Sequence, residues 1–224
     1  GGGVDKTSLA LEVIKSRTFI ERFIKNNQLL VPLMGVERWD MYENTLIYDE
    51  EVYNHKTQEW VRDVKFPKTP QPSQWESFEY FSKEILSVTQ DKESSMVTIS
   101  ISYFSPGIAK DWLTLLVKEI NSEMKNKDQS EAKNSIDFLT KKLEQTDLTG
   151  MKNVFYQLIE EQTKTMMLTE VSDEYVLKTI DPSQVPDDKD QPKRALIVVL
   201  GTMLGGMLST LFVLIRYFKN YRKN

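Results

Sequence analysis

The sequence predicts an α+β protein with three parts: an α/β base close to a membrane, a long helical hairpin projecting from it, and a C-terminal transmembrane helix. Three observations predict this fold class. Residues 195–215 carry no charge, residues 107–181 contain no proline, and residues 96–104 alternate between apolar and polar side chains. A charge-free run of this length is typical of a membrane span, whereas alternation is typical of a strand.

The charge-free run comprises 21 residues. As a helix it extends about 30 Å, the thickness of a bilayer's hydrocarbon core. A helix buried in a soluble protein would normally present a polar face, but this run offers only Thr202, Ser209 and Thr210. We therefore predict a transmembrane helix over residues 193–217. Its flanks are basic, with four cationic side chains after the run, so the positive-inside rule places residues 218–224 in the cytoplasm.

A cytoplasmic tail requires that residues 1–192 have crossed the membrane. Export of this kind needs a signal peptide or an earlier span. The chain begins with Gly1, Gly2 and Gly3 rather than with Met. We expect a fragment whose N-terminal transmembrane helix is missing from this chain, although the glycines also fit the remnant of a tag.

Charge and cysteine content limit the function of the exported part. Residues 193–224 hold six basic groups and no acid, so residues 1–192 keep 23 of the 29 basic groups and all 33 acidic groups, a net charge of −10. A surface of this sign is a poor partner for nucleic acid. The sequence has no cysteine, which is compatible with the periplasm and excludes disulfides and thiolate metal sites.

The base is predicted over residues 1–104 and 172–181. Residues 5–26 read as one amphipathic helix, capped by Asp5, Thr7 or Ser8 and ended by Pro32. Residues 45–48 and 60–61 are expected to form short strands. Prolines 67, 70 and 72 predict an extended connector.

A capping box, Ser73 to Glu76, starts the next predicted helix. This helix is expected to bury Trp75, Phe78, Phe81 and Ile85. Residues 86–89 and 96–104 should pair as a hairpin, and residues 175–180 should add another strand.

Residues 105–171 are predicted to form the projecting hairpin. Ser105 and Pro106 give a cap and a first-turn proline. An apolar stripe follows and is then interrupted by residues 125–135, whose only apolar residue is Ala132. A stretch that is polar all round is not expected to pack inside a globule, so we expect it to project. The chain should turn near residues 146–150 and return as a second helix.

Two motifs lie in the predicted transmembrane helix and directly before it. Gly201, Gly205 and Ser209 recur every fourth residue in the predicted span, with Gly206 beside them. Small residues at this spacing let another helix approach closely, although glycine is also common in membrane helices. Pro182, Pro186 and Pro192 make residues 181–192 a proline-rich linker, read either as a stiff spacer or as an element that fixes the angle of the span.

No pattern in the sequence specifies catalysis. His55 stands alone in a polar turn, where a solvated loop histidine is the simpler reading. The phosphate loop, the nucleophile elbow and the HExxH motif are all missing from these 224 residues. We therefore predict a protein that is not an enzyme, with no catalytic residues, no cofactor and no metal.

The order of four segments resembles a known family. These segments read ALEVIKSRTFIERFI, VTISISYFSPGIAKDW, FYQLIEEQTKTMMLTEV and TIDPSQVPDDKDQPKRALIVVLGTMLGGML. They are similar to the Wzz chain-length determinant proteins, the class of polysaccharide co-polymerases without a kinase domain.

The resemblance implies a periplasmic domain between two inner-membrane helices and a ring of identical subunits, with eight copies expected. It implies that the ring sets the modal length of lipopolysaccharide O-antigen or a related surface glycan. The expected partners are a membrane-embedded polysaccharide polymerase and possible contact with the lipid-linked glycan. Two other classes remain open, an envelope adaptor or transport accessory and a membrane-tethered enzyme.

Overall fold

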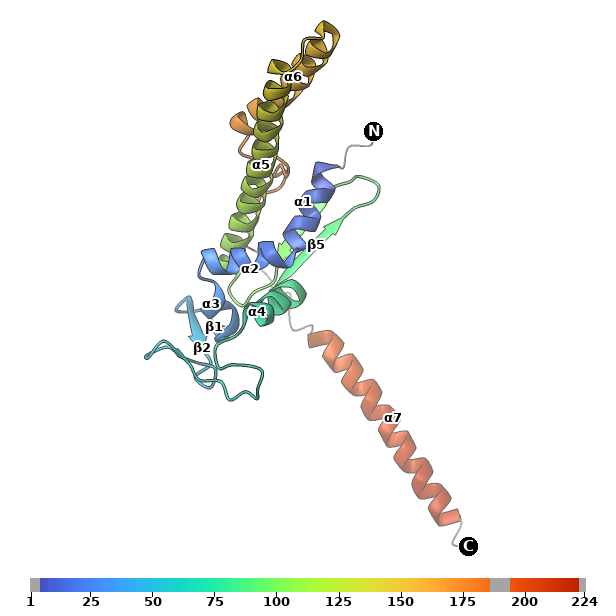
Figure 1. Ribbon diagram of the computed structural model, residues 1–224. Coiled ribbons are helices and arrows are strands. Elements are labelled where there is room, and N and C mark those ends of the chain that lie inside the picture. The colour runs from blue at the N-terminus through green and yellow to red at the C-terminus, as the bar shows by residue number, and fades with distance from the viewer. Residues whose placement is uncertain (1–4, 186–193, 222–224) are drawn as a thin grey trace. The chain divides into compact units, whose positions relative to one another are not determined.

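The computed structural model describes residues 5–185 and 194–221, and the chain divides into two compact units (Figure 1). The first unit comprises residues 1–185 and the second residues 186–224. The first is a mixed helical unit with some sheet, and the second holds one long helix, α7 (Arg194–Tyr221).

The N-terminal helical segment is two helices, so the prediction of one helix over residues 5–26 was wrong. Helix α1 (Lys6–Lys15) and helix α2 (Arg17–Asn26) meet at Ser16, whose backbone is extended. The Ser16 hydroxyl accepts a hydrogen bond from the Phe19 amide and so caps α2. Asp5 caps α1, as predicted. Pro32 does not end the helix, because it lies inside the short helix α3 (Leu30–Met34).

The sheet content of the first unit consists of three separate antiparallel hairpins among the described residues. The prediction of strands at residues 45–48, 86–89 and 96–104 is confirmed with small shifts at the ends. The pairs are β1 (Val36–Asp40) with β2 (Thr45–Tyr48), β3 (Tyr53–Asn54) with β4 (Glu59–Trp60), and β5 (Leu86–Gln90) with β6 (Val97–Ile101).

Helix α4 (Gln74–Tyr80) begins with the predicted capping box between Ser73 and Glu76. It continues into one π-helical segment, η1 (Phe81–Ile85). Phe81 and Ile85 are buried, but Trp75 is 51% exposed. The prediction that Trp75 is buried was therefore wrong.

The loop between β4 and α4 is held by Arg62. Its guanidinium donates to the carbonyl oxygens of Thr69 and Pro70, at 2.9 and 2.7 Å, and to both carboxylate oxygens of Glu76. Burial raises the pKa of Glu76, but the bonds from Arg62 and from the Ser73 amide outweigh it and lower this pKa. The proline-rich connector is thus fixed to the start of α4.

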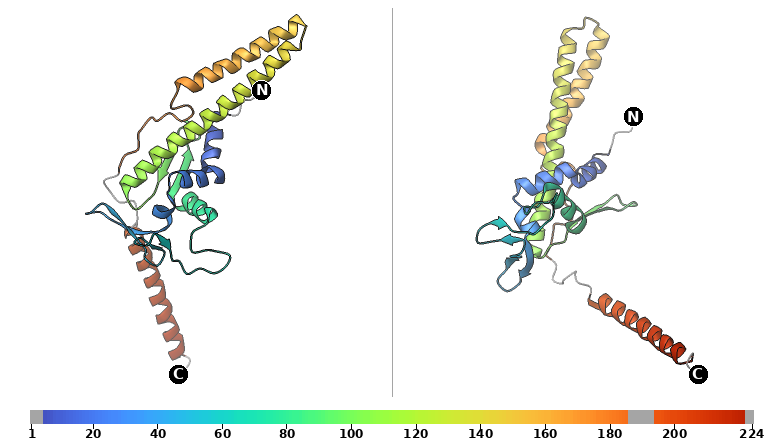
Figure 2. Two further views of the ribbon diagram at one scale, coloured as in Figure 1. Left: turned by 60° about the vertical axis from the view of Figure 1, so that its left-hand side comes forward. Right: turned by 60° about the horizontal axis from the view of Figure 1, so that its bottom comes forward.

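Helix α5 (Pro106–Glu144) and helix α6 (Thr149–Val171) form a hairpin with its turn near residues 145–148, as predicted (Figure 1). The hairpin's far end extends beyond the other elements of the first unit in both views of Figure 2. At the near end, Trp112 joins the core, with ring centroids 4.5 Å from Tyr103 and 6.5 Å from Phe81. Phe81 in turn packs 5.7 Å from Phe23 of α2.

The buried apolar side chains of α5 recur at every fourth residue: Trp112, Leu116, Ile120, Met124 and, after Asp128, Ala132. Four residues of an α-helix turn through about 400°, so each step displaces the stripe by about 40° around the axis. Over five steps the stripe moves to the opposite side of the helix. This displacement lets α5 contact the core near its start and another set of elements further along.

The prediction that residues 125–135 project rather than pack is only partly correct, because most of their side chains are exposed but Ala132 and Asp128 contact other elements. Ala132 is buried, and Asp128 is bonded to Lys6 of α1 and to Tyr175 of the segment that follows α6. A polar stretch can be covered when its partners are themselves polar side chains, a pairing that periodicity does not reveal. The hairpin therefore extends freely only beyond this point.

Residues 175–180 are not a strand, contrary to the prediction. Their backbone is bonded to the side chain of Asn121, which is only 3% exposed. The Asn121 carbonyl accepts from the amides of Val176 and Leu177, and its amide donates to the Leu177 carbonyl, all at 2.9 Å. One buried amide side chain thus takes the place of a neighbouring strand.

We expect Asn121→Ala to destabilise the first unit by about 2–4 kcal/mol, because three hydrogen bonds are lost and two backbone amides lose their partner. Asn121→Asp should also destabilise, since it cannot donate to Leu177. Denaturant unfolding measures both. Asn134→Ala, at an exposed site on the same helix, serves as the control and should change stability by less than about 0.5 kcal/mol. Equal effects of Asn121→Ala and Asn134→Ala would contradict the role of Asn121.

Candidate membrane and assembly site

Helix α7 is the one helix among the described residues that is long and apolar enough to cross a membrane. Its apolar window is Ile197–Leu214, and none of that window is buried within the chain. At about 1.5 Å per residue, its 28 residues extend about 42 Å. The helix therefore exceeds the thickness of a hydrocarbon core, and its exposed leucine, valine and methionine side chains require an apolar environment.

The four small residues predicted as a packing surface lie along α7. A Cβ atom added at Gly201, Gly205 or Gly206 would meet no atom within 4 Å. The fold of this chain therefore does not require glycine at these positions. The Ser209 hydroxyl donates to the Gly206 carbonyl at 2.9 Å, so its hydrogen-bond donor is satisfied within the helix. Gly201, Gly205, Gly206 and Ser209 together form what we call the small-residue face.

The juxtamembrane prolines are only partly described. Pro182 lies in an extended, exposed segment after α6. Pro186 and Pro192 lie outside the described residues. Ser183 lies 3.2 Å from Thr114, measured between the two hydroxyl oxygens, so the chain leaves the first unit beside the start of α5.

A charged cluster fastens the hairpin to the base. Lys6 donates to the Asp128 carboxylate and to the Tyr175 hydroxyl, and this hydroxyl donates to Asp128 at 2.7 Å. Burial raises the pKa of Asp128, but the bonds from Lys6 and Tyr175 and the charge of Lys6 outweigh it and lower this pKa. Burial lowers the pKa of Lys6, and the bonds to Asp128 and Tyr175 outweigh it and raise that pKa. For both groups the hydrogen bonds within the cluster, and not burial, decide the direction of the pKa shift.

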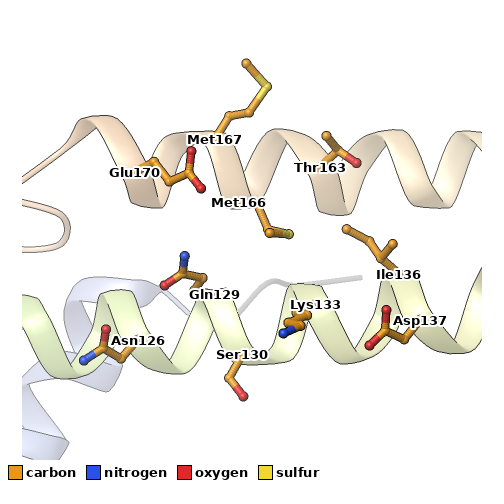
Figure 3. Close-up of a pocket in the computed structure, with 10 residues that line it drawn as sticks. All are labelled: Asn126, Gln129, Ser130, Lys133, Ile136, Asp137, Thr163, Met166, Met167 and Glu170. Carbon is orange, nitrogen blue, oxygen red and sulfur yellow. The ribbon is translucent and has the colours of Figure 1, made fainter.

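A shallow groove runs between α5 and α6 (Figure 3). Met166 points from α6 toward Ile136 of α5, whereas Met167 and Ser130 point away from the gap. The groove is open to solvent and is lined by amide, hydroxyl and charged side chains besides Ile136 and the two methionines. It contains two carboxylates, Asp137 and Glu170, and one amine, Lys133. No cofactor chemistry follows from this set.

Metal-ligand chemistry is not visible in the described part of the chain. Residues 5–185 and 194–221 contain no group of three His, Asp or Glu side chains placed to hold a metal ion. His55 is exposed in its turn and stacks on Tyr48, with ring centroids 4.8 Å apart. The predicted loop histidine thus has a local packing role.

The hairpin exposes apolar side chains that no part of this chain covers in the described residues. They begin near the far end of α5 and continue along α6. The most exposed of them are Phe138, Leu148, Met151, Val154, Tyr156, Leu158, Met167, Leu168 and Val171.

A comparison with family models matches residues 143–218 to the family described as "G-rich domain on putative tyrosine kinase". The match runs from the end of α5 through α6 and most of α7. This domain is found in polysaccharide co-polymerases and chain-length determinant proteins. The resemblance to the chain-length determinant family is confirmed. A comparison with curated proteins finds no match.

The small-residue face and Pro182 fall within the segment that matches the G-rich domain. The domain is typical of membrane-associated proteins, in agreement with the apolar length of α7. Sequence reasoning found this part because glycine spacing and charge-free length are visible without the fold. It missed Asn121 and the Lys6 cluster, since their partners are distant in sequence. It also missed Arg62, whose partners lie 7 to 14 residues away but include two backbone carbonyls that no side-chain pattern marks.

We expect Asp128→Asn to lower stability by about 1 kcal/mol at about pH 7, a modest value because Lys6 is partly exposed. The pKa of Asp128 is lowered on folding, so its contribution is complete above the unfolded value of 3.8 and is lost as pH falls through the lower folded value. The difference between wild type and variant should therefore shrink below pH 3.8. Urea unfolding at several pH values measures it.

Asp137→Asn is the matched control, because Asp137 lies on the same helix and is exposed. Its effect should stay small across the same pH range. A wild-type advantage over Asp128→Asn that persists unchanged into strong acid would contradict the ion-pair assignment.

We expect Gly205→Leu to weaken assembly of the detergent-solubilised protein more than Val198→Leu does. Both positions are exposed on α7, but only Gly205 belongs to the small-residue face, where a larger side chain keeps another helix at a distance. Size-exclusion chromatography with light scattering measures the oligomer mass. Equal effects of the two substitutions would count against a helix-packing role.

Proposed function

We propose that this protein regulates the chain length of a surface polysaccharide, the modal length of lipopolysaccharide O-antigen or a related glycan, without catalysing a reaction. It acts as an oligomeric inner-membrane scaffold on the polymerase. The observation that carries the proposal is the G-rich domain over residues 143–218, which indicates a role in polysaccharide export or chain-length regulation.

We infer that residues 1–192 lie in the periplasm as one domain of the Wzz type, with residues 218–224 in the cytoplasm and a first transmembrane helix upstream. The four cationic side chains after the charge-free run, against two directly before it, support this topology. In this arrangement the base lies close to the membrane, because the chain leaves the first unit beside the start of α5.

Self-association into a ring, with eight copies as the expected number, is part of the proposal. The exposed apolar side chains of the hairpin support it, since a projecting pair of helices with uncovered Phe138, Val154 and Leu158 gains by packing against a neighbour. The small-residue face offers a second contact within the membrane, either to another copy or to the polymerase.

In this mechanism the protein contributes geometry. The cluster of Lys6, Asp128 and Tyr175 and the bonds of Asn121 hold the hairpin at a fixed place on the base. Copies joined through the hairpins would then present a surface of fixed dimensions beside the polymerase, and these dimensions would influence when elongation of the lipid-linked glycan ends.

Deletion of the gene tests the proposal. We expect the glycan length distribution on gels to broaden while the total amount of glycan persists, because the polymerase still works without its scaffold. Complete loss of glycan would instead indicate an enzyme or a transport component. An unchanged distribution would also overturn the proposal.

Complementation refines the test. Leu158→Glu places a charge among the exposed apolar side chains of α6, whereas Gln157→Glu places the same charge at the neighbouring exposed position. The proposal expects Gln157→Glu to restore the length distribution and Leu158→Glu to fail. Restoration by both would argue against assembly through this face.

A further inference from the structure

The loop between β4 and α4 presents an aromatic side chain entirely to solvent. Phe66 is 96% exposed, the highest value among the large apolar side chains of the described residues. Its turn is closed by a bond from the Lys68 amide to the Lys65 carbonyl. Transfer of a phenylalanine from water to an apolar environment is favourable by about 2 kcal/mol, so the exposed ring gains if it meets an apolar phase.

The loop is not a loose chain, because Arg62 binds its carbonyl oxygens at Thr69 and Pro70 and reaches Glu76 at the cap of α4. These bonds hold the turn that carries Phe66 out from the body. Figure 1 and the left view of Figure 2 show this loop protruding at the end of the first unit opposite the turn between α5 and α6.

Two lysines flank Phe66, and the nearest acidic residue in the sequence, Asp63, lies three positions before it. Residues 64–75 contain Lys65 and Lys68 and no acidic residue. The Lys68 amine lies 3.6 Å from Glu76, and its side chain remains 60% exposed. Phenylalanine can enter the headgroup boundary of a bilayer while neighbouring lysines keep their ammonium groups with the phosphates.

The covalent chain limits how far this end can lie from the bilayer. Ser183 contacts Thr114, and α7 begins at Arg194. Nine Cα–Cα steps from Val185 to Arg194 reach at most about 30 Å when fully extended. Ser183 thus lies near the start of α5, away from its turn with α6, and the loop that carries Phe66 also lies away from that turn (Figure 1).

We propose that Phe66 inserts into the headgroup boundary of the bilayer, with Lys65 and Lys68 facing lipid phosphates. This contact rests on the proposed topology, in which the base of the periplasmic domain lies close to the membrane. It gives the first unit a second attachment to the membrane besides α7 and so restricts its tilt. A partner protein or a glycan at Phe66 is the alternative occupant and is distinguished by the test.

The test uses the absence of cysteine from the sequence, because one introduced thiol gives one labelled site. The full chain carrying Phe66→Cys is labelled with a fluorophore and reconstituted into phosphatidylethanolamine and phosphatidylglycerol vesicles. Some of the lipids carry a nitroxide near the headgroup. Substitution at so exposed a site removes no packing.

Tyr42→Cys is the matched control. Tyr42 is 92% exposed at the tip of the β1–β2 hairpin, but it lies between Asp40 and Glu43, which phosphates repel. We expect the nitroxide lipids to quench the label at residue 66 at least about twofold more than the label at residue 42. Lys65→Glu with Lys68→Glu should reduce quenching at residue 66. Absent quenching at residue 66, or equal quenching at both sites, overturns the proposal.

A third label at Leu148, in the turn between α5 and α6 and 70% exposed, separates this proposal from the topology. The topology expects no quenching there. Quenching at residue 148 without quenching at residue 66 would overturn both the membrane contact and the proposed position of the base. If neither label is quenched, the contact of Phe66 alone fails, because the glycan assay of the deletion strain does not involve this residue.

Discussion

The packing of α5 against two sets of elements determines the arrangement of the first unit. Near its start, Trp112 lies against Tyr103 and Phe81, which connect it to α2 through Phe23. Further along, the stripe has turned about the axis, and Asp128 meets Lys6 and Tyr175 instead. A helix with a straight apolar stripe would serve only one of these contacts. The slow rotation of the stripe therefore lets one helix belong to both the base and the hairpin.

Asn121 and Asp128 hold the segment after α6, and this has consequences for function. The segment leads from the hairpin toward the membrane helix, and three bonds from one buried amide fix its course at Val176 and Leu177. A displacement of the hairpin would therefore also move the segment by which the chain leaves the first unit. Under the proposed function such rigidity would be useful, because the fixed dimensions of the scaffold are what would influence the polymerase.

The membrane helix and the exposed hairpin residues present the same physical problem in two solvents. Both leave apolar side chains uncovered by their own chain. In the proposed topology lipid would cover most of α7, and the small-residue face would add a place where another helix gains by close packing rather than by the hydrophobic effect. In water the hairpin's apolar side chains gain when another surface covers them. In the proposed assembly, contacts in the membrane and contacts in water would reinforce each other.

Length, periodicity and local chemistry were sufficient to predict several elements. The membrane helix, the long helices around residues 105–171, the β5–β6 hairpin and the capping box at Ser73 each depend on residues close together in the sequence. The break at Ser16 was not predicted, because the apolar pattern continues across it and one serine, although it favours caps, is a weak signal against that pattern.

Contacts between distant residues had to come from the fold. Asn121 satisfies a segment 55 residues away, so residues 175–180 look like a strand by composition and yet have no strand beside them. Trp75 is exposed although its helix position suggests burial. The polar stretch around Asp128 is covered by side chains from both ends of the unit. Hydropathy records the preference of each residue for water. Whether a polar group can be buried depends on its hydrogen-bond partner, and folding alone brings that partner into place.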